Sequence, residues 1–323
     1  MAKVFVVIPN WNGIDYLDAC LKSILNQSIR LSIVVVDNGS IDGSAELLEK
    51  KYQQVDLIRL AENTGFTGGV NAGINRALSQ KADYVALFNN DAVADKKWAE
   101  NLLKAAIDNP GSGIVTGKFL RIEGERIDST GEQYSTRGLP FSRGRNQLEN
   151  GQYDNQVDVF GATGGASLYS AKMLKEVGLF DQSFFAYFED VDISFRSQLM
   201  GWKVTYEPSA IAYHHIGATS SKLGDFSRYH SAKNFILCYT KNMPGQLYFK
   251  YLPLFLMQLM RWSISSLLKG KTMPFLKGLF SAVWLLPNAF IQRHFIQSNR
   301  KVSIAYIDSI LYHHRPPRPP KIR

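Results

Sequence analysis

The chain has 323 residues, 45% of them hydrophobic and 20% charged, which is typical of a folded protein and excludes a disordered one. Its two cysteines, Cys20 and Cys238, provide neither a disulfide framework nor the paired cysteines of a zinc site. The net charge of +9 is unevenly distributed, because residues 226–323 carry 15 lysines and arginines against one acid, Asp308. This asymmetry predicts two parts with different functions, an acidic part and a basic part that binds an anionic partner.

The first apolar segment, residues 4–8, ends at Pro9. It is too short for a secretory signal peptide and fits a first buried strand better. We therefore expect a protein that is not exported, and the unpaired cysteines favour a reducing cytoplasm.

Residues 1–225 alternate short β-branched segments with segments whose apolar residues recur at helical spacing. The predicted strands are residues 4–8, 33–36, 57–60, 84–88 and 114–116, and the predicted helices are residues 16–25, 44–51, 69–78 and 97–107. This alternation predicts an α/β fold with a mostly parallel central sheet.

The chain from residue 130 onward is less regular. Polar residues 130–156 predict a long loop or an irregular hairpin. Two helices follow, at residues 171–177 and 189–199, and two short late strands are expected at residues 203–206 and 210–213.

Polar segments follow four of the predicted strands, at residues 9–10, 37–40, 63–69 and 89–91. Parallel α/β sheets bind ligands at the carboxyl ends of their strands. A carboxylate there, such as Asp37, can accept a hydrogen bond from a nucleobase or ribose, or it can merely cap the next helix. The glycines of the third segment allow an anion to approach the backbone, although a plain turn is the alternative.

Titratable residues mark the remaining candidate sites. Asp91 leaves a predicted strand, where Mg²⁺ or Mn²⁺ could bridge the protein and a diphosphate. Glu189 and Asp190 begin a predicted helix, where the macrodipole favours acids and where one carboxylate could also act as a general base. His214 and His215 end the acidic part; neighbours on a strand point in opposite directions, so at most one reaches a metal.

Together these motifs resemble family 2 glycosyltransferases with a GT-A fold, and most of all their rhamnosyltransferase branch. The matching run covers residues 4–220, and the order and spacing of its landmarks are specific. The landmarks are residues 8–13, 36–40, 63–73, 88–91, 164–166, 184–192 and 201–202.

The resemblance implies a role for each matching residue. Asp37 would read a pyrimidine base, Asp91 and His214 would hold Mg²⁺ or Mn²⁺ (with His215 as the alternative), Asp190 would deprotonate the acceptor hydroxyl, and Glu189 would orient a sugar. The implied donor-binding residues are Pro9, Asn10, Asp37, Asn63, Gly65, Gly68, Asn71 and Asn90.

One departure concerns the acidic metal motif, which reads Asn89-Asn90-Asp91 here and keeps a single carboxylate. This branch commonly tolerates that change, but it weakens the expectation of metal binding. A non-catalytic protein that binds a nucleotide sugar or a polysaccharide, with a decayed metal site, is therefore the alternative function.

The basic part, residues 226–323, predicts helices rich in aromatic and apolar residues. Residues 247–268 come nearest to a membrane span, but two cations and a proline interrupt them, so interfacial helices on an anionic membrane surface are favoured over a span. The cations are spaced among long apolar runs, which disfavours a nucleic-acid surface.

The predicted function combines these parts. We expect an inverting transferase that moves a sugar, first of all L-rhamnose from dTDP-rhamnose and next a sugar from a UDP donor, to a lipid-linked glycan in cell-surface polysaccharide synthesis. It would lie in the cytoplasm, attached peripherally to the inner face of the cell membrane.

Overall fold

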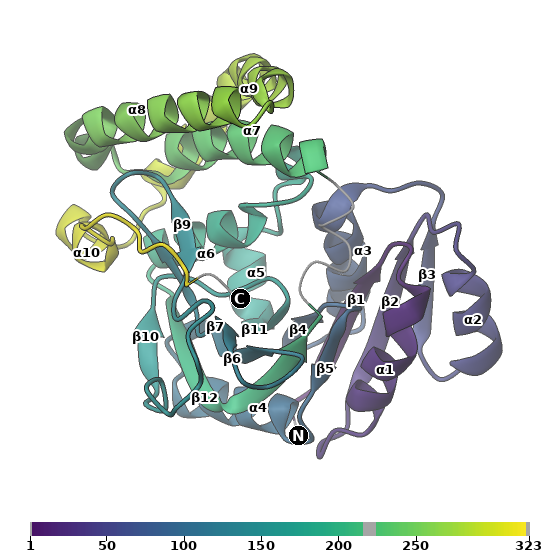
Figure 1. Cartoon of the computed structure of the whole chain (residues 1–323). Helices are drawn as coiled ribbons and strands as arrows, with labels where there is room; N and C mark the ends of the chain where they lie inside the picture. Colours follow the sequence, from purple (N-terminus) through teal and green to yellow (C-terminus); the bar gives the residue numbers. More distant parts are fainter. Residues whose placement is uncertain (1, 216–223, 321–323) are drawn as a thin grey trace.

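The structure is a computed structural model that describes residues 2–215 and 224–320. A ten-stranded mixed sheet forms its centre, with strand order β10-β12-β6-β11-β4-β1-β2-β3 and two short strands added at β6 and β12 (Figure 1). The strands are β1 (Val4–Asn10), β2 (Ser32–Asn38), β3 (Asp56–Leu60), β4 (Tyr84–Phe88), β5 (Ala92–Ala94), β6 (Ser112–Arg121), β7 (Ile127–Ser129), β10 (Val157–Val159), β11 (Ala166–Ser170) and β12 (Lys203–His214).

The first half of the sheet is a parallel, helix-connected unit. Strands β4, β1, β2 and β3 lie side by side in parallel, as the alternating sequence pattern predicts. The helices around the sheet are α1 (Ile14–Leu25), α2 (Ser44–Lys51), α3 (Gly65–Ser79), α4 (Trp98–Asp108) and α5 (Ala171–Val177). Both faces of β1 are covered: Val4, Val6 and Ile8 pack with one hydrophobic cluster, and Phe5 and Val7 with the other. This explains its continuous apolar sequence.

The second half mixes strand directions, because β11 pairs antiparallel with both β4 and β6. The two predicted late strands are one strand, β12, which runs parallel to β6 with a register shift between Glu207 and Ile211. A side chain at Gly117 of β6 would overlap the carbonyl oxygen of Ala210, so the irregular segment needs a glycine opposite it. The polar segment 130–156 contains a small hairpin, β8 (Glu132–Tyr134) and β9 (Pro140–Ser142).

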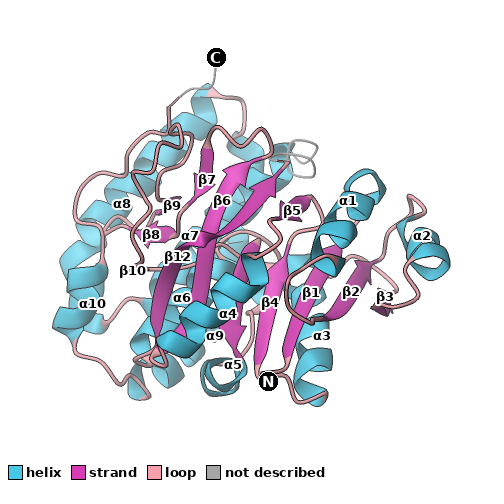
Figure 2. Cartoon of the chain, turned by 90° about the horizontal axis from the view of Figure 1, so that it is seen from below, coloured by secondary structure: helices cyan, strands magenta, loops and turns pink. Residues whose placement is uncertain are grey.

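The C-terminal helices form a layer over α6 (Glu189–Leu199) (Figures 1 and 2). They are α7 (Gly224–Asn242), α8 (Gly245–Leu268), α9 (Thr272–Ser298) and α10 (Ile304–Ile310). One hydrophobic cluster joins Phe160 and Phe195 of the first part to Phe235, Tyr239 and Phe255 of the helices. The amino-acid composition changes at the expected boundary between residues 1–225 and 226–323, but the hydrophobic packing continues across it.

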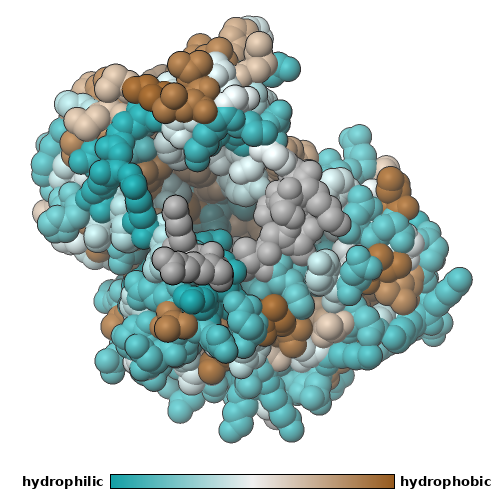
Figure 3. Space-filling view, in the orientation of Figure 1, coloured by the Kyte–Doolittle hydropathy of each residue, from teal (hydrophilic) through white to brown (hydrophobic). Residues whose placement is uncertain are grey.

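A layer of apolar side chains remains exposed on α8 and α9 (Figure 3). Within the described residues, α9 is the helix that is long and apolar enough to cross a membrane, with 22% of its most apolar window buried. The sequence-based candidate, residues 247–268, corresponds to α8 and does not meet that criterion. The exposed residues are Phe249, Leu256, Met257, Met260, Ile264, Leu267, Leu268, Met273, Leu276, Phe280, Val283, Trp284, Phe290, Ile291 and Phe295.

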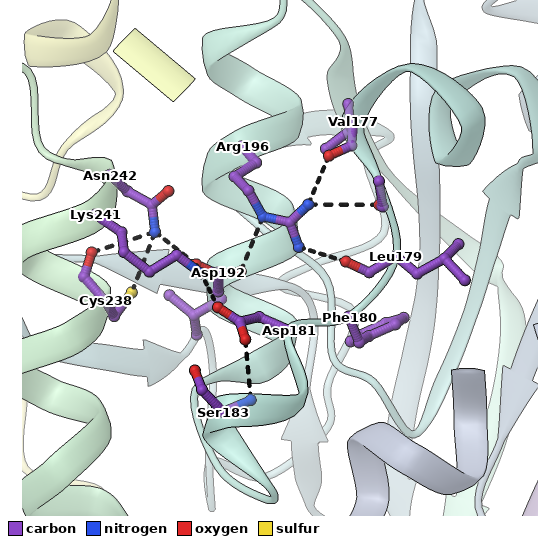
Figure 4. Close-up of polar contacts among 12 residues, drawn as sticks. Val177, Leu179, Phe180, Asp181, Ser183, Asp192, Arg196, Cys238, Lys241 and Asn242 are labelled. Atoms are coloured by element: carbon purple, nitrogen blue, oxygen red, sulfur yellow. Dashed lines mark hydrogen bonds and ion pairs between the residues drawn. The ribbon is translucent and has the colours of Figure 1, made fainter. Parts of the chain in front are cut away.

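A buried ionic cluster joins α6 to α7 (Figure 4). Asp192 is fully buried, and its carboxylate contacts Arg196 Nε at 2.9 Å, Lys241 Nζ at 2.9 Å and Asn242 Nδ2 at 2.8 Å. Lys241 also contacts Asp181. Burial alone would raise the pKa of Asp192, but the neighbouring Lys241 and Arg196 charges outweigh it and lower the pKa to about 2. The cluster thus keeps its acids ionised inside the protein.

We predict that Lys241→Met lowers the free energy of unfolding by about 3–5 kcal/mol, because it removes the cation that Asp181 shares with the fully buried Asp192, which is left with Arg196. The matched control is Lys250→Met, whose half-exposed pair with Asp308 should contribute about 1 kcal/mol or less. Urea unfolding of both variants measures the difference. Equal losses would show that the buried cluster does not stabilise the packing of α6 against α7.

Candidate active site

The ends of β1, β2 and β4 bring four of the expected donor-binding residues together. The register pairs Asn10 with Asp37, and both are buried. Asn10 Nδ2 donates to Asp37 Oδ1 at 3.1 Å, and Asn90 Nδ2 donates to Asn10 Oδ1 at 2.7 Å. Pro9 precedes this chain of hydrogen bonds on β1. Asp37 is thereby held in one orientation at the carboxyl end of the sheet.

Asp37 does not cap the helix that follows it. Its second oxygen accepts from Ser40 N at 3.3 Å, whereas Ser44 N at the start of α2 donates to Asp42 at 3.0 Å. Ser40, which could have capped α2, instead accepts from Asn12 N at 2.9 Å. The capping alternative for Asp37 is therefore wrong, and its carboxylate is part of a turn that faces the ends of β1 and β4.

The glycine-rich segment packs against the loop that precedes the acids. Gly65 has a φ of +77°, and a side chain there would lie 2.5 Å from the carbonyl oxygen of Phe185. That oxygen accepts from Thr67 N at 3.1 Å. Asn63 Oδ1 accepts from Gly65 N at 2.8 Å, and Gly68 lies in the first turn of α3. The segment connects the donor side of the sheet to the acid-bearing loop.

Asn71 differs from its expected role in donor binding. Its side chain is buried, and its amide donates to Phe180 O at 2.7 Å and accepts from Phe180 N at 3.1 Å. Both ends of the amide are therefore bonded to one backbone residue 109 positions away. We correct the assignment: Asn71 fixes α3 to the segment before the acids.

The loop before Glu189 is held in an uncommon conformation. Phe185, Tyr187 and Phe188 have φ values of 65°, 67° and 70°, which side-chain-bearing residues rarely adopt. Asn234 of α7 is fully buried and donates to the carbonyl oxygens of Phe184, Ala186 and Tyr187 at 2.7–3.0 Å. The C-terminal helices therefore fix the position of the acids.

The two acids at the start of α6 differ in their surroundings. Asp190 accepts from Gly164 N at 3.2 Å and Val191 N at 2.8 Å, yet burial raises its pKa. Glu189 is buried, one of its oxygens has no hydrogen-bond partner among the described residues, and burial followed by the Asp190 charge raises its pKa well above the usual range. A carboxylate with a raised pKa is a better proton acceptor, as a general base requires.

Asp91 and His214 face each other across the end of the sheet. His214 Nε2 lies 3.2 Å from Asp91 Oδ1, and its Nδ1 lies 2.8 Å from Asp128 Oδ2. Burial lowers the pKa of His214, but the bonds to Asp128 and Asp91 outweigh it and raise the pKa to about 9. His215 instead places its ring 5.1 Å from Tyr16. His214 is therefore the histidine on the side of Asp91.

This arrangement fits a divalent cation bound mainly by its substrate. Within the residues that the structure describes, no three His, Cys, Asp or Glu side chains form a metal-binding group. Mg²⁺ and Mn²⁺ are often held by one or two protein ligands plus phosphate oxygens, which Asp91 and His214 Nε2 match. Asp128 orients the imidazole from its other nitrogen, as outer carboxylates do in histidine metal sites. No local sequence pattern pointed to Asp128.

A cavity of about 550 Å³ opens beside Asp190, between the β8–β9 hairpin, the start of α6 and the C-terminal tail. Glu132 lies in its wall and was also missed by the sequence reasoning. Its carboxylate accepts from Ser129 Oγ at 2.8 Å, and burial followed by the Asp190 charge raises its pKa to about 8. The cavity is large enough for a sugar and an attached group.

Hydrogen-bonded polar residues at the sheet edge, an Asp–His pair and buried acids next to a cavity are the features that a nucleotide-sugar-dependent glycosyltransferase of the GT-A fold requires. The family model for glycosyl transferase family 2 matches residues 5–178. The chain belongs to this family and is a glycosyltransferase.

Among curated relatives, the chain is 29% identical over 238 residues to the N-acetylglucosaminyl-diphospho-decaprenol L-rhamnosyltransferase of Mycobacterium tuberculosis, covering 65% of this chain and 75% of the relative. It is 26% identical over 224 residues to the poly-beta-1,6-N-acetyl-D-glucosamine synthase of Staphylococcus aureus, covering 65% of this chain and 52% of the relative.

Solved structures show the same fold. Residues 1–349 of S. aureus TarS with UDP align with a TM-score of 0.58 at 15% identity, covering 95% of this chain and 90% of TarS. The mannosyltransferase PcManGT from Pyrobaculum calidifontis, in complex with GDP-Man and Mn²⁺, aligns with a TM-score of 0.54 at 15% identity, covering 95% and 85%. GT-A proteins of this kind thus bind nucleotide sugars, and some are solved with Mn²⁺.

We predict that Glu132→Gln has a higher free energy of unfolding than the unchanged protein at pH 8.5. The difference between the two proteins should be much smaller at pH 5. Because the folded pKa of Glu132 is about 8 and its ordinary value is 4.5, the folded state holds an extra proton between these pH values. Stability due to Glu132 is therefore lost as pH rises toward 8, by on the order of a few kcal/mol.

Thermal unfolding from pH 5 to pH 8.5 measures this effect, with the exposed Glu123→Gln as the control. The control should follow the unchanged protein at every pH. A difference between Glu132→Gln and the unchanged protein that stays constant with pH would contradict the raised pKa.

Proposed function

We propose that the protein is an inverting transferase that moves L-rhamnose from dTDP-rhamnose to a lipid-linked glycan acceptor during synthesis of a cell-surface polysaccharide. The observation that carries the proposal is the position of the Asp190 carboxylate, at the start of α6 and in the wall of a cavity of about 550 Å³. Similarity to the mycobacterial L-rhamnosyltransferase supports the choice of sugar and acceptor. UDP-sugars are the next donors to test.

The donor would bind along the ends of β1, β2 and β4. Asp37, oriented by Asn10, would accept a hydrogen bond from the imide N–H of the pyrimidine. Asp91 and His214 would hold a divalent cation, Mg²⁺ or Mn²⁺, which when bound offsets the charge of the donor diphosphate. Asn63, Gly65 and Gly68 would line the donor site at the start of α3, where Gly65 also lies against Phe185 of the loop before the acids.

The transfer itself would depend on Asp190. Its carboxylate would take the proton of the acceptor hydroxyl while that oxygen bonds to the anomeric carbon and the bond to the nucleoside diphosphate breaks. Attack from the face opposite the leaving group inverts the anomeric centre in one displacement. Glu189, buried beside Asp190, would orient the sugar through the oxygen that has no hydrogen-bond partner among the described residues.

We predict that Asp190→Asn lowers kcat by about 10²–10⁴-fold, because asparagine cannot accept the proton. The measurement is release of nucleoside diphosphate from a panel of nucleotide sugars with Mg²⁺ or Mn²⁺ and a membrane extract as the acceptor source. Binding of the nucleoside diphosphate should be unchanged in the variant, which separates lost chemistry from lost folding.

One donor that turns over only with Asp190 present would support the assignment and name the sugar. Turnover within threefold of normal in Asp190→Asn would remove Asp190 as the base. A folded protein that binds a nucleotide sugar but releases nothing would favour the non-catalytic alternative.

The exposed layer on α8 and α9 supports attachment to an anionic membrane at its inner, cytoplasmic face. Of the 21 exposed large hydrophobic side chains in the described structure, 15 lie on these two helices. Arg261, Lys269 and Lys277 are exposed on or next to the same helices. Each cation near an anionic surface contributes about 1 kcal/mol. The apolar layer and the cations therefore suit a helix pair that lies in the interface.

We predict that the double variant Phe280→Ser, Trp284→Ser loses at least about tenfold in affinity for vesicles of phosphatidylglycerol and phosphatidylcholine, because both rings are more than 70% exposed and apolar. The control is Ile41→Ser, which removes a 93% exposed side chain that is far from α8 and α9 in the sequence. Vesicle sedimentation with the full chain is required, since deleting residues 226–323 would remove more than half of a hydrophobic cluster. Equal vesicle binding by both variants would contradict the membrane assignment.

A further inference from the structure

We infer that the cavity beside Asp190 contains a binding site for the diphosphate of the acceptor, formed by Arg143, Arg145 and Arg318, and that the C-terminal tail is one of its walls. The inference rests on the proposed lipid-linked acceptor and adds the group by which that acceptor is held. All three arginines line the same cavity of about 550 Å³ as Asp190.

The tail is attached to the site at two places. Tyr312 N donates to Tyr134 O at 2.9 Å, and Tyr312 O accepts from Thr136 N at 3.0 Å. Farther along, Asn146 Nδ2 donates to Pro320 O at 2.9 Å. Arg318 lies between these anchors, in a segment that four prolines make stiff. The tail thus presents its arginine to the cavity at little cost in conformational entropy.

Arg143 carries a charge that has no carboxylate counterion among the described residues. Its guanidinium carbon lies 4.7 Å from the ring centres of Tyr153 and Tyr206, and its Nε donates to Thr130 O at 3.0 Å. No carboxylate lies within ion-pair distance of it in the part of the chain that the structure describes. Burial lowers the pKa of Arg143. A buried guanidinium of this kind is stabilised when an anion enters the cavity.

Arg145 adds a second cation with a partial exposure of 41%, although it is also paired with Asp128 at 3.0 Å. Guanidinium groups bind phosphates through paired N–H donors, so several arginines around one cavity suit a diphosphate better than a neutral sugar. The acids Glu132 and Asp190 lie in the same wall and would face the sugar hydroxyls. The cavity therefore combines arginines that can bind a diphosphate with carboxylates that can bind sugar hydroxyls.

The hairpin connects this cavity to the apolar helices. At its turn, Gly138 lies against the ring of Phe255, and Arg137 Nη1 lies 3.7 Å from the sulfur of Met257, an exposed residue of α8. In Figure 3 the surface is hollowed below the apolar layer of α8 and α9. A lipid-linked acceptor could keep its chain at that layer, its diphosphate at the arginines and its hydroxyl at Asp190.

The test is calorimetric binding of geranyl diphosphate to the full chain in EDTA, which removes metal-dependent binding at Asp91 and His214. We expect Arg318→Ala to raise Kd at least about tenfold, as the loss of a charge-assisted contact predicts. Arg315→Ala removes the same charge from a position of the same tail that does not line the cavity, and its Kd should stay within twofold. Geraniol, which lacks phosphate, should bind all three proteins equally weakly.

Equal losses in Arg318→Ala and Arg315→Ala would overturn the site, because they would indicate general attraction between charges. Equally tight binding of dihexanoyl phosphatidylglycerol, with the same dependence on Arg318, would overturn it in favour of a bulk headgroup site. The outcome is separate from that of the transfer reaction. Arg318-dependent binding in a protein that transfers no sugar would leave the site standing, whereas Asp190-dependent transfer with no effect of Arg318 would overturn the site alone.

Discussion

The carboxylate of Asp192, fully buried between α6 and α7, accepts hydrogen bonds from Arg196, Lys241 and Asn242. Two of these three partners come from α7, so the start of α6 is fixed only when α7 is docked. Asn234, on the same helix, bonds three carbonyl oxygens of the loop that precedes the acids. The position of Asp190 therefore depends on a helix that lies outside the family's matched region, residues 5–178.

The two sides of the proposed site, the donor side and the acceptor side, are built differently. The donor side uses backbone geometry that short-range sequence encodes: Asp37 and Asn10 meet because their strands are neighbours in register. The acceptor side uses strained residues, hairpin residues and a folded-back tail, held by contacts between distant segments. Strain in the loop at residues 185–188 is tolerated because Gly65 and Thr67 secure it from one side and Asn234 from the other.

This difference explains what the sequence could predict. The parallel half of the sheet and the helices at residues 44–51, 171–177 and 189–199 follow from local periodicity. Asp128 and Glu132 do not lie in recognisable local motifs, because the role of each depends on a residue far along the chain. Asp128, for example, pairs with His214, 86 residues away. The expected role of Asn71 in donor binding differs from the structure for the same reason. Its hydrogen bond to Phe180 cannot be inferred from the sequence around Asn71.

The dependence of the acid loop on α7 also sets an order of events during synthesis. The sheet, complete once β12 has left the ribosome, can form its donor side first, as N-terminal regions generally do. The loop at residues 185–188 cannot settle until Asn234 and Lys241 have emerged. Those residues precede the apolar helices α8 and α9, so the acid-bearing loop can settle before the proposed membrane surface exists, whereas the tail that forms one wall of the cavity is made last.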